Sequence, residues 1–367
     1  HGARGNLMGV LIRKHLNAPV ISTVHSDYRL DYLGRPAAMV SYGITYIFVL
    51  RRVNYYIGVS RPMTELLIER NFPPEKIQTI YNGIDFKTPL NYTSKYEFYR
   101  SINFKVDPDD VVLGIAARLS PVKDLPTLLK AVAEVCENLS NVKLIIAGDG
   151  EDADKLKKLA ADLKISDKVC FAGWLNDINS FYNAIDINLL TSISETFPYA
   201  LTEGARMKCA TIASNVGGVP VLIDSGKNGY IFEPGDYKML AQNLTELIEN
   251  EDLRINMGNM LYKKTSQLFS IDKMVEDQLT IYKNVLEQHE RKMNRKRDGI
   301  IICGAYGYGN AGDDAILQSI ISSVRKLDKN TPITILAKNT KNVKKIFNVD
   351  SIYTFNIFKM ISTMRKS

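Results

Sequence analysis

The chain has 367 residues, of which 45% are hydrophobic and 24% are charged, as is typical of an ordinary globular protein with two domains and part of a third. Its net charge of +7 and isoelectric point of about 9.0 favour anionic partners, such as a nucleotide, a phosphate, an acidic polymer or a membrane surface. The four cysteines are far apart and form no CxxC pair, which argues against a zinc site or a disulfide framework and suits the cytosol.

One apolar stretch near the amino terminus bears on membrane contact. It reads AAMVSYGITYIFVL (37–50) and is followed by Arg51 and Arg52. Its fourteen residues are too few to span a bilayer. They predict either a buried helix or a helix beside a membrane-borne substrate, with the arginines near the lipid surface. The chain begins at His1 with no signal peptide, and we expect it to be a fragment of a longer protein.

Strands and helices alternate through the amino-terminal part of the chain. The apolar runs 18–26, 53–60 and 76–85 read as strands. Such alternation with helical patterns is typical of parallel, doubly wound sheets. The polar, aromatic stretch 91–110 has no clear period and reads as a linker or hinge.

The alternation restarts after this stretch. We predict six further strands, at 111–119, 142–151, 168–175, 185–192, 209–218 and 229–236. Helices are predicted at 125–139, 151–165 and 271–292. The fold class is therefore α/β, with two Rossmann-like doubly wound domains at 1–106 and 107–270. A cross-over helix and basic linker (271–297) lead to the beginning of a third α/β module at 298–367.

Two cations and a glycine turn follow the first strands of the second domain. Arg118 and Lys123 lie in ARLSPVKD, between a strand and a helix. Cations beside a helix amino terminus suit a diphosphate, although a solvated surface loop is the alternative. Gly148 and Asp149 belong to a Gly-Asp-Gly turn, where a ligand can approach the backbone closely or where the chain simply turns.

Two carboxylates, Glu195 and Glu203, stand eight positions apart in ETFPYALTE. On one helix they would lie about 80° apart, so they would not share a face. Pro198 suits the first turn of a helix, which places Glu195 in the preceding loop and Glu203 inside the helix. The free N–H groups of about Tyr199 and Ala200 then attract an anion between the two acids. Carboxylates accept hydrogen bonds from vicinal hydroxyls, so the arrangement suits a nucleotide sugar.

Several ordered motifs carry a family resemblance over roughly residues 1–290. RLSPVKDLPTLLKAV, LIIAGDGE, FAGWLND and SISETFPYALTEGARMKCATIASNVGG together resemble the group 1 (family 4) retaining glycosyltransferases of the two-domain GT-B fold. The resemblance implies that Arg118 and Lys123 contact the donor diphosphate. It implies that Glu203 binds the ribose and Glu195 the hydroxyls of the donor sugar.

The resemblance assigns roles to further residues. His25, in TVHSDY, would face the reacting sugar and join Arg118, Lys123 and Glu195 as a catalytic residue, and Trp174 would lie near the base. Donor contacts are also expected from Gly148, Asp149, Phe197, Pro198, Tyr199 and Ala200. The family usually needs no essential metal and no cofactor, because cationic side chains carry the diphosphate charge. The family's opening strand and Gly-rich loop would precede His1.

A second glycine loop, GAYGYGNAGDDA (304–315), opens the third module. It formally matches a dinucleotide fingerprint, but the next strand ends in Lys338 rather than in an acid, so NADP is only an alternative. The loop is similar to the opening of polysaccharide pyruvyl transferases, with Asn310, Gly312 and Asp313 matching. That resemblance implies phosphoenolpyruvate as donor and a cell-wall glycan as acceptor. Because the match covers about 70 residues, we expect this partial module to be inactive.

The combined prediction is a retaining glycosyltransferase of bacterial cell-surface polysaccharide synthesis, fused to a partial pyruvyl transferase. It would move a sugar from a nucleoside-diphosphate sugar to a glycan or lipid-linked acceptor, with no nucleic-acid partner. We expect it in the cytoplasm, with peripheral contact to the inner face of the plasma membrane. The alternatives are a GT-B sugar-nucleotide epimerase and a non-catalytic nucleotide- or glycan-binding module.

Overall fold

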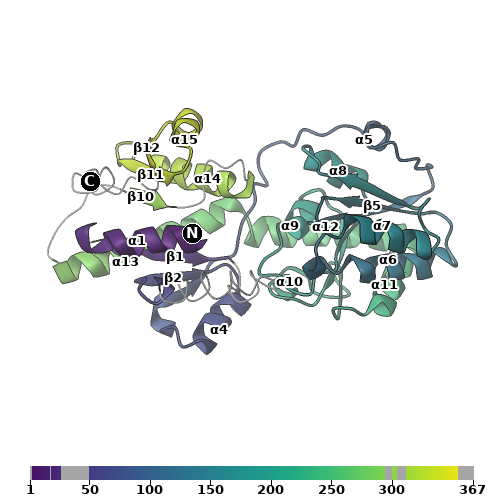
Figure 1. Cartoon of the computed structure of the whole chain (residues 1–367), viewed down its shortest axis with the longest axis horizontal. Helices are drawn as coiled ribbons and strands as arrows, with labels where there is room; N and C mark the ends of the chain where they lie inside the picture. Colours follow the sequence, from purple (N-terminus) through teal and green to yellow (C-terminus); the bar gives the residue numbers. More distant parts are fainter. Residues whose placement is uncertain (1, 17, 26–48, 294–299, 304–310, 354–367) are drawn as a thin grey trace. The chain divides into compact units, whose positions relative to one another are not determined.

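The computed structural model describes residues 2–16, 18–25, 49–293, 300–303 and 311–353. By residue contacts the chain divides into two compact units (Figure 1). Unit 1 joins His1–Tyr81 to Ile271–Ser367, and unit 2 is Asn82–Ser270. Each unit is described by itself.

Unit 2 is built on a six-stranded, wholly parallel sheet in the order β6-β5-β4-β7-β8-β9. Its strands are β4 (Val111–Ala116), β5 (Val142–Ala147), β6 (Val169–Gly173), β7 (Ile187–Leu190), β8 (Ala210–Ser214) and β9 (Tyr230–Phe232). All six strands predicted from the apolar runs are present. Each is shorter than its run because the polar residues at the ends form loops.

Successive residues of the central strands face opposite sides of this sheet. Leu113 and Ile115 pack with α6 (Leu125–Cys136) and α11 (Tyr237–Glu249) in one core. Val112 packs with α8 (Ile178–Ala184) in a second core on the other side (Figure 1). Because helices cover both faces of the sheet, residues that point to either face are apolar, and the strands read as continuous apolar runs.

The stretch 91–110, predicted to be a linker or hinge, contains a helix. α5 spans Lys95–Ser101 and begins with a capping box, in which Ser94 and Glu97 hydrogen-bond each other's backbone. Phe98 and Tyr99 of this helix are buried in the same core as α8. The prediction was wrong because a helix of seven residues is too short to display a period.

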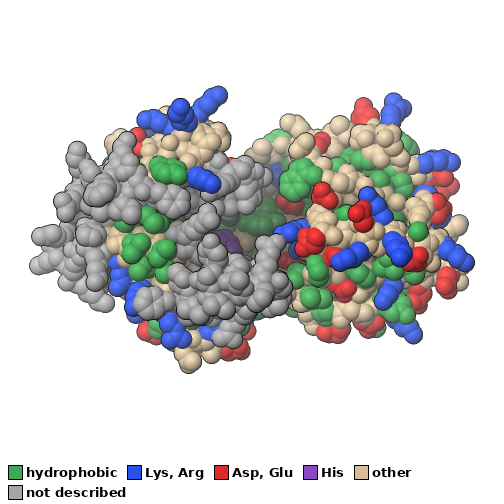
Figure 2. Space-filling model, in the orientation of Figure 1, with side chains coloured by type: hydrophobic (Ala, Val, Ile, Leu, Met, Phe, Trp, Pro, Cys, Tyr) green, Lys and Arg blue, Asp and Glu red, His purple; other side chains and the backbone are tan. Residues whose placement is uncertain are grey.

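The other helices of unit 2 complete the two layers. They are α7 (Ala153–Asp162), α9 (Tyr199–Arg206), α10 (Val219–Leu222) and α12 (Glu251–Leu268). α9 and α12 pack against each other and along β8. Acidic and basic side chains are interspersed on the visible surface over α6, α7 and α11 (Figure 2).

Unit 1 contains two three-stranded parallel sheets. The first sheet is β1 (Ile21–Val24), β2 (Tyr55–Gly58) and β3 (Ile77–Thr79), and the second is β10 (Ile300–Cys303), β11 (Ile333–Ala337) and β12 (Asp350–Tyr353). Within the described residues of this unit the helices are α1 (Gly2–Leu16), α4 (Arg61–Glu69), α13 (Ile271–Met293), α14 (Ala311–Leu327) and α15 (Thr340–Phe347). The third α/β module predicted after residue 298 thus contains a strand, a helix and a second strand in β10, α14 and β11.

α13 lies against the first sheet of unit 1, as its apolar stripe requires. Met274, Val275 and Val285 pack against Ile57 and Ile80. No helix within the described ranges is both long and apolar enough to cross a membrane. Most of the apolar stretch 37–50 lies outside the described residues.

Candidate active site

The sheet order of unit 2 creates a switch point between β4 and β7. From β4 the chain passes outward to β5 and β6, whereas from β7 it passes in the opposite direction to β8 and β9. Ligands of open parallel sheets bind beyond the carboxyl ends of the strands at such a point. The loops after β4 (117–124) and β7 (191–198) therefore border the expected site.

Lys123 and Glu195 meet at this switch point. Lys123 ends a short 3-10 turn, Pro121–Lys123, and its Nζ lies 2.5 Å from Glu195 Oε1. The two side chains are only 24% and 14% exposed. Ser192 Oγ also donates to Glu195 Oε1, at 2.7 Å. The acid is thus held by one cation and one hydroxyl.

Backbone contacts fasten the two loops to each other. Thr191 Oγ1 donates to the Lys123 carbonyl at 2.7 Å, and the Ile193 N–H donates to the Val122 carbonyl at 2.9 Å. Both bonds join the chain after β7 to the chain after β4. The relative position of the Lys123 and Glu195 side chains therefore does not depend on their own contact alone.

The loop after β8 packs closely against the loop that carries Glu195. Gly217 has φ +50°, and a Cβ there would lie 1.8 Å from the Glu195 carbonyl oxygen. The neighbouring Gly218 N–H donates to the Thr196 carbonyl at 2.9 Å. Only glycine combines the positive φ with this close approach.

Arg118 also faces an acid, but in a far more open setting. Its Nη2 lies 3.0 Å from Oε2 of Glu151, and the two side chains are 64% and 53% exposed. Glu151 follows the Gly-Asp-Gly turn after β5, so the contact links the exits of the two neighbouring strands. An exposed pair of this kind contributes little to stability and leaves the guanidinium accessible to a ligand.

The Gly-Asp-Gly turn itself is packed against the loop after β4. Gly148 has φ +130°, and a Cβ there would lie 1.9 Å from the Ala117 carbonyl oxygen. The Leu119 N–H donates to the Asp149 carbonyl at 3.0 Å. The glycine predicted for close ligand approach therefore also serves a close approach of two loops.

Glu203 lies on α9, which starts at the switch point. Tyr182 Oη donates to its Oε2 at 3.0 Å, and burial raises the pKa of Glu203. Pro198 was predicted to lie in the first turn of the helix, but it is the cap residue immediately before α9. The N–H groups of Tyr199 and Ala200 thus open the helix, as expected.

The predicted donor residue Phe197 differs from its neighbours. Its side chain is buried, and its ring packs 5.3 Å from the ring of Phe269. Any donor contact from this residue would come from its backbone. Trp174, by contrast, is 80% exposed at the end of β6, after Gly173 with φ +68°. It is the single tryptophan of the chain.

His25 belongs to unit 1, where it follows β1. Its side chain is half-buried, and burial lowers its pKa to about 4. The imidazole is therefore neutral at physiological pH, so it can exchange hydrogen bonds with a sugar hydroxyl but carries no charge there. In the third module, Asn310 lies outside the described residues, whereas Gly312 and Asp313 fall in the first turn of α14.

The structure brings Lys123 and Glu195 together and places Arg118, Gly148 and Asp149 on adjoining loops. Sequence reasoning missed Glu151, Ser192 and Tyr182. Glu151 directly follows the Gly-Asp-Gly turn, and its negative charge at the end of a neighbouring strand could have indicated a contact with Arg118. Tyr182 lies 21 positions before Glu203, and no local pattern links the two.

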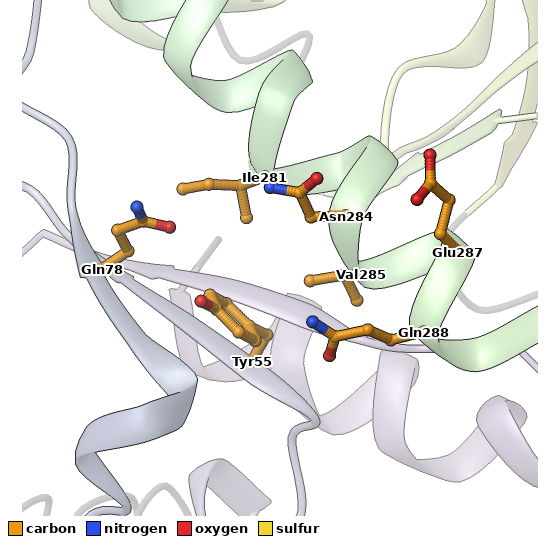
Figure 3. A pocket seen from close by; sticks show the side chains of 7 residues that line it. All are labelled: Tyr55, Gln78, Ile281, Asn284, Val285, Glu287 and Gln288. Carbon is orange, nitrogen blue, oxygen red and sulfur yellow. The ribbon is translucent and has the colours of Figure 1, made fainter. Parts of the chain in front are cut away.

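A shallow pocket of about 180 Å³ lies in unit 1, between β2, β3 and α13 (Figure 3). It is lined by Tyr55, Gln78, Ile281, Asn284, Val285, Glu287 and Gln288. No predicted site residue is among them. Within the described ranges, no group of three or more His, Cys, Asp or Glu side chains is arranged to hold a metal ion.

Known families match both parts of the chain. Residues 98–264 match the family model of glycosyl transferases group 1, and residues 1–88 match that of glycosyltransferase family 4. The fold also matches the structure of the Anabaena protein HepE solved with UDP, with a TM-score of 0.63 at 21% identity over 80% of this chain and 77% of that one. The chain therefore has the GT-B fold and carries the sequence features of a glycosyltransferase. The sucrose-phosphate synthase of Thermosynechococcus elongatus has the same fold, with a TM-score of 0.63 at 18% identity over 76% of this chain and 71% of that one.

The curated relatives of this glycosyltransferase are distant. An uncharacterized glycosyltransferase of Methanocaldococcus jannaschii is 26% identical over 79% of this chain and 76% of its own length. The N-acetyl-alpha-D-glucosaminyl L-malate synthase of Bacillus anthracis is 29% identical over 65% of this chain and 62% of its own length. An Escherichia coli protein named UDP-Gal:alpha-D-GlcNAc-diphosphoundecaprenol alpha-1,3-galactosyltransferase is 24% identical over 77% of this chain and 73% of its own length.

Proposed function

We propose that this glycosyltransferase moves a sugar from a nucleoside-diphosphate sugar to a glycan or lipid-linked acceptor in bacterial cell-surface polysaccharide synthesis. The observation that carries the proposal is the Lys123–Glu195 pair, at the switch point and beside the start of α9. It joins a cation for phosphate to an acid for sugar hydroxyls. The name of the Escherichia coli relative, with its UDP-sugar donor and diphospholipid acceptor, agrees with this substrate class.

In the proposed reaction the leaving group is a nucleoside diphosphate, whose departure requires neutralisation of the charge that develops on it. Lys123 and Arg118 supply two cations from the loop after β4. The first N–H groups of α9, at Tyr199 and Ala200, add the partial positive charge of a helix start. These groups are in place on their loops before the donor arrives, and each cation exchanges its acidic partner for a phosphate when the donor binds.

The donor's two polyols are assigned to the two acids. Glu195 takes the hydroxyls of the sugar, because its carboxylate is held beside the cation that would bind the neighbouring phosphate. Glu203 takes the ribose hydroxyls, farther along α9. Trp174, exposed at the end of β6, offers its ring to the base.

We assign retention of configuration on the basis of the family resemblance. The acceptor hydroxyl oxygen bonds to the anomeric carbon on the face from which the diphosphate leaves, and the bond from that carbon to the phosphate oxygen breaks. The acceptor's proton passes to the departing phosphate oxygen, so no side-chain base is needed. His25, neutral at physiological pH, would orient a hydroxyl of the reacting sugar rather than carry charge.

Binding of the donor is tested by titrating the full chain with UDP, GDP, ADP, NADP and phosphoenolpyruvate. The fluorescence of Trp174, the single tryptophan, reports contact with the base, and the thermal unfolding midpoint reports binding. We expect one nucleoside diphosphate to bind, and Glu203→Ala to abolish this. Glu137→Ala, at the exposed far end of α6, is the matched control. Binding of NADP with no diphosphate bound would overturn the proposal.

Turnover separates transfer from the alternatives. A transferase releases nucleoside diphosphate from its sugar donor much faster when an acceptor is present. A sugar-nucleotide epimerase acts on the donor without an acceptor, and a binding module releases nothing. Polyprenyl-diphosphate-linked sugars and free oligosaccharides are the acceptors to compare.

We place the reaction on the cytoplasmic side of the membrane, with peripheral contact through a basic edge of unit 1. There the Arg13 guanidinium donates to the Arg52 carbonyl, and that of Arg51 donates to the Arg70 carbonyl at 3.5 Å, so two guanidinium groups are held against the backbone of this edge. Anionic vesicles should bind the chain at low salt, and Arg51→Glu should weaken this binding. Equal binding to neutral vesicles would contradict it.

For the third module we retain the resemblance to pyruvyl transferases as part of the proposal. Its parallel strands β10 and β11, joined through α14, suit such a module. Phosphoenolpyruvate should not be consumed by this chain in the presence of a glycan. Consumption would show that residues 298–367 form more of an active site than their length suggests.

A further inference from the structure

A buried phenol contacts the carboxylate of Glu203. Tyr182, on α8, is 1% exposed, and its ring packs 5.0 Å from that of Phe181 in a T-shaped arrangement. Its hydroxyl donates to Glu203 Oε2 at 3.0 Å. Because the ring is enclosed on all sides, the hydroxyl has a fixed position and cannot swing to another acceptor.

Tyr182 keeps its proton under all ordinary conditions. Burial, and then the neighbouring charge of Glu203, raise its pKa well above the usual value. The phenol is therefore always a donor to the carboxylate. Burial raises the pKa of Glu203, and the hydrogen bond from Tyr182 acts in the opposite direction. The phenol thus favours the ionised form of the acid, which is the better acceptor for hydroxyl groups.

The hydrogen bond from Tyr182 distinguishes the two oxygens of the Glu203 carboxylate. Tyr182 occupies Oε2, and within the described residues it is the one group that hydrogen-bonds this carboxylate. Fixing Oε2 also fixes the rotation of the carboxylate about its terminal torsion, which is otherwise broad. Oε1 then points in a direction that the protein, not the ligand, determines.

We propose that Tyr182 is a positioning residue for the ribose of the nucleotide: it turns the Glu203 carboxylate so that Oε1 accepts from the ribose hydroxyls. This rests on the proposed function, in which Glu203 binds the ribose. Without the phenol the carboxylate rotates freely and must be ordered by the ligand itself. The effect is confined to ligands that carry the hydroxyls.

The test compares a ribonucleotide with its hydroxyl-free analogue. The probes are whichever of UDP, GDP and ADP binds the wild-type chain, and its 2′,3′-dideoxy form. We expect Tyr182→Phe to weaken the ribonucleotide by about tenfold and to leave the dideoxy form unchanged. A merely structural role would weaken both equally.

Tyr99→Phe is the matched control. Tyr99 is buried in the same core as Tyr182, but its hydroxyl donates to the Ala184 carbonyl rather than to an acid of the site. Both variants should lower the thermal unfolding midpoint, whereas only Tyr182→Phe should change the preference for the ribose form. Equal loss of both ligands in Tyr182→Phe, or no loss of either, overturns the proposal.

A second variant guards against unfolding caused by an unpaired buried charge. The double variant Tyr182→Phe, Glu203→Gln removes the charge together with its donor and should bind the ribonucleotide no worse than Glu203→Gln alone. Weaker binding would show that Tyr182 acts otherwise than through Glu203. If the wild type binds ribose and dideoxy forms equally, this inference fails while the proposed function stands. If it binds no nucleotide, the proposed function itself fails.

Discussion

Lys123 and Arg118 come from the same loop and are assigned to the same diphosphate, yet they should respond differently to truncation. The Lys123–Glu195 pair is 24% and 14% exposed, whereas the Arg118–Glu151 pair is 64% and 53% exposed. Lys123→Ala leaves a largely enclosed carboxylate with a hydroxyl partner but without its cation. Arg118→Ala leaves a carboxylate that water solvates.

The magnitudes follow from these exposures. Breaking an exposed pair changes the free energy of unfolding by under about 1 kcal/mol, and breaking a fully buried one by about 3–5 kcal/mol. The Lys123 pair lies between these limits, so Lys123→Ala should cost about 2 kcal/mol, which is about 4–8 °C in the unfolding midpoint for a unit of this size. Arg118→Ala should cost less than about 0.5 kcal/mol. Both should lower sugar transfer by about 10²-fold, because each removes a charge from the leaving group.

The assay is thermal unfolding of the full chain beside steady-state transfer rates. A third variant, Lys123→Ala with Glu195→Gln, removes the orphaned charge and should recover most of the lost stability while remaining inactive. Equal midpoints for Lys123→Ala and Arg118→Ala would refute the reasoning from burial. A double variant as unstable as Lys123→Ala would show that the orphaned charge is not the cause.

Three further outcomes are expected. Gly217→Ala should lower sugar transfer strongly, because its Cβ would lie 1.8 Å from a carbonyl oxygen of the loop after β7. Gly226→Ala is the control: it bears the same kind of backbone strain at φ +80°, has open space around it, and should stay active. The free energy of unfolding of the wild type, relative to that of His25→Gln, should fall by about 3 kcal/mol as the pH drops from 6.5 to 4. The pKa of His25 is lowered in the folded state, so its protonation favours unfolding. Urea unfolding at a series of pH values measures this, and parallel stability curves for the two proteins would contradict it. Glu151→Gln should tighten nucleoside diphosphate binding about two- to threefold by freeing Arg118, as titration calorimetry would show, whereas unchanged or weaker binding would contradict the competition.

Local patterns were sufficient to predict the elements that position the site. Apolar runs located β4 and β7, and the polar residues after them located Lys123 and Glu195. The order of the strands could not be predicted in this way, because periodicity says which residues form a strand but not which strands are neighbours. Because β4 and β7 are neighbours in the sheet, Lys123 lies 2.5 Å from a side chain 72 residues away.

The missed features share a physical cause. The helix Lys95–Ser101 is too short for its period to emerge, although its capping box was visible as Ser94 and Glu97. Tyr182 lies on α8, a helix of seven residues that was not among the predicted helices, and its ring is buried in the core. Its hydroxyl carries the chemistry, and the apolar pattern of the helix contains no information about where that hydroxyl points.

The pairing of both cations with acids bears on how the proposed site releases its product. Lys123 contacts Glu195 and Arg118 contacts Glu151, so a diphosphate exchanges one anionic partner for another. A phosphate that approaches a buried cation without a partner also relieves the cost of that unpaired charge. Where the cation already has an acidic partner this gain is absent, so the diphosphate binds less tightly. The exchange also leaves each cation a partner when the nucleoside diphosphate departs. In the proposed enzyme the leaving group is also the most strongly charged product, so a weaker hold on the diphosphate favours its release.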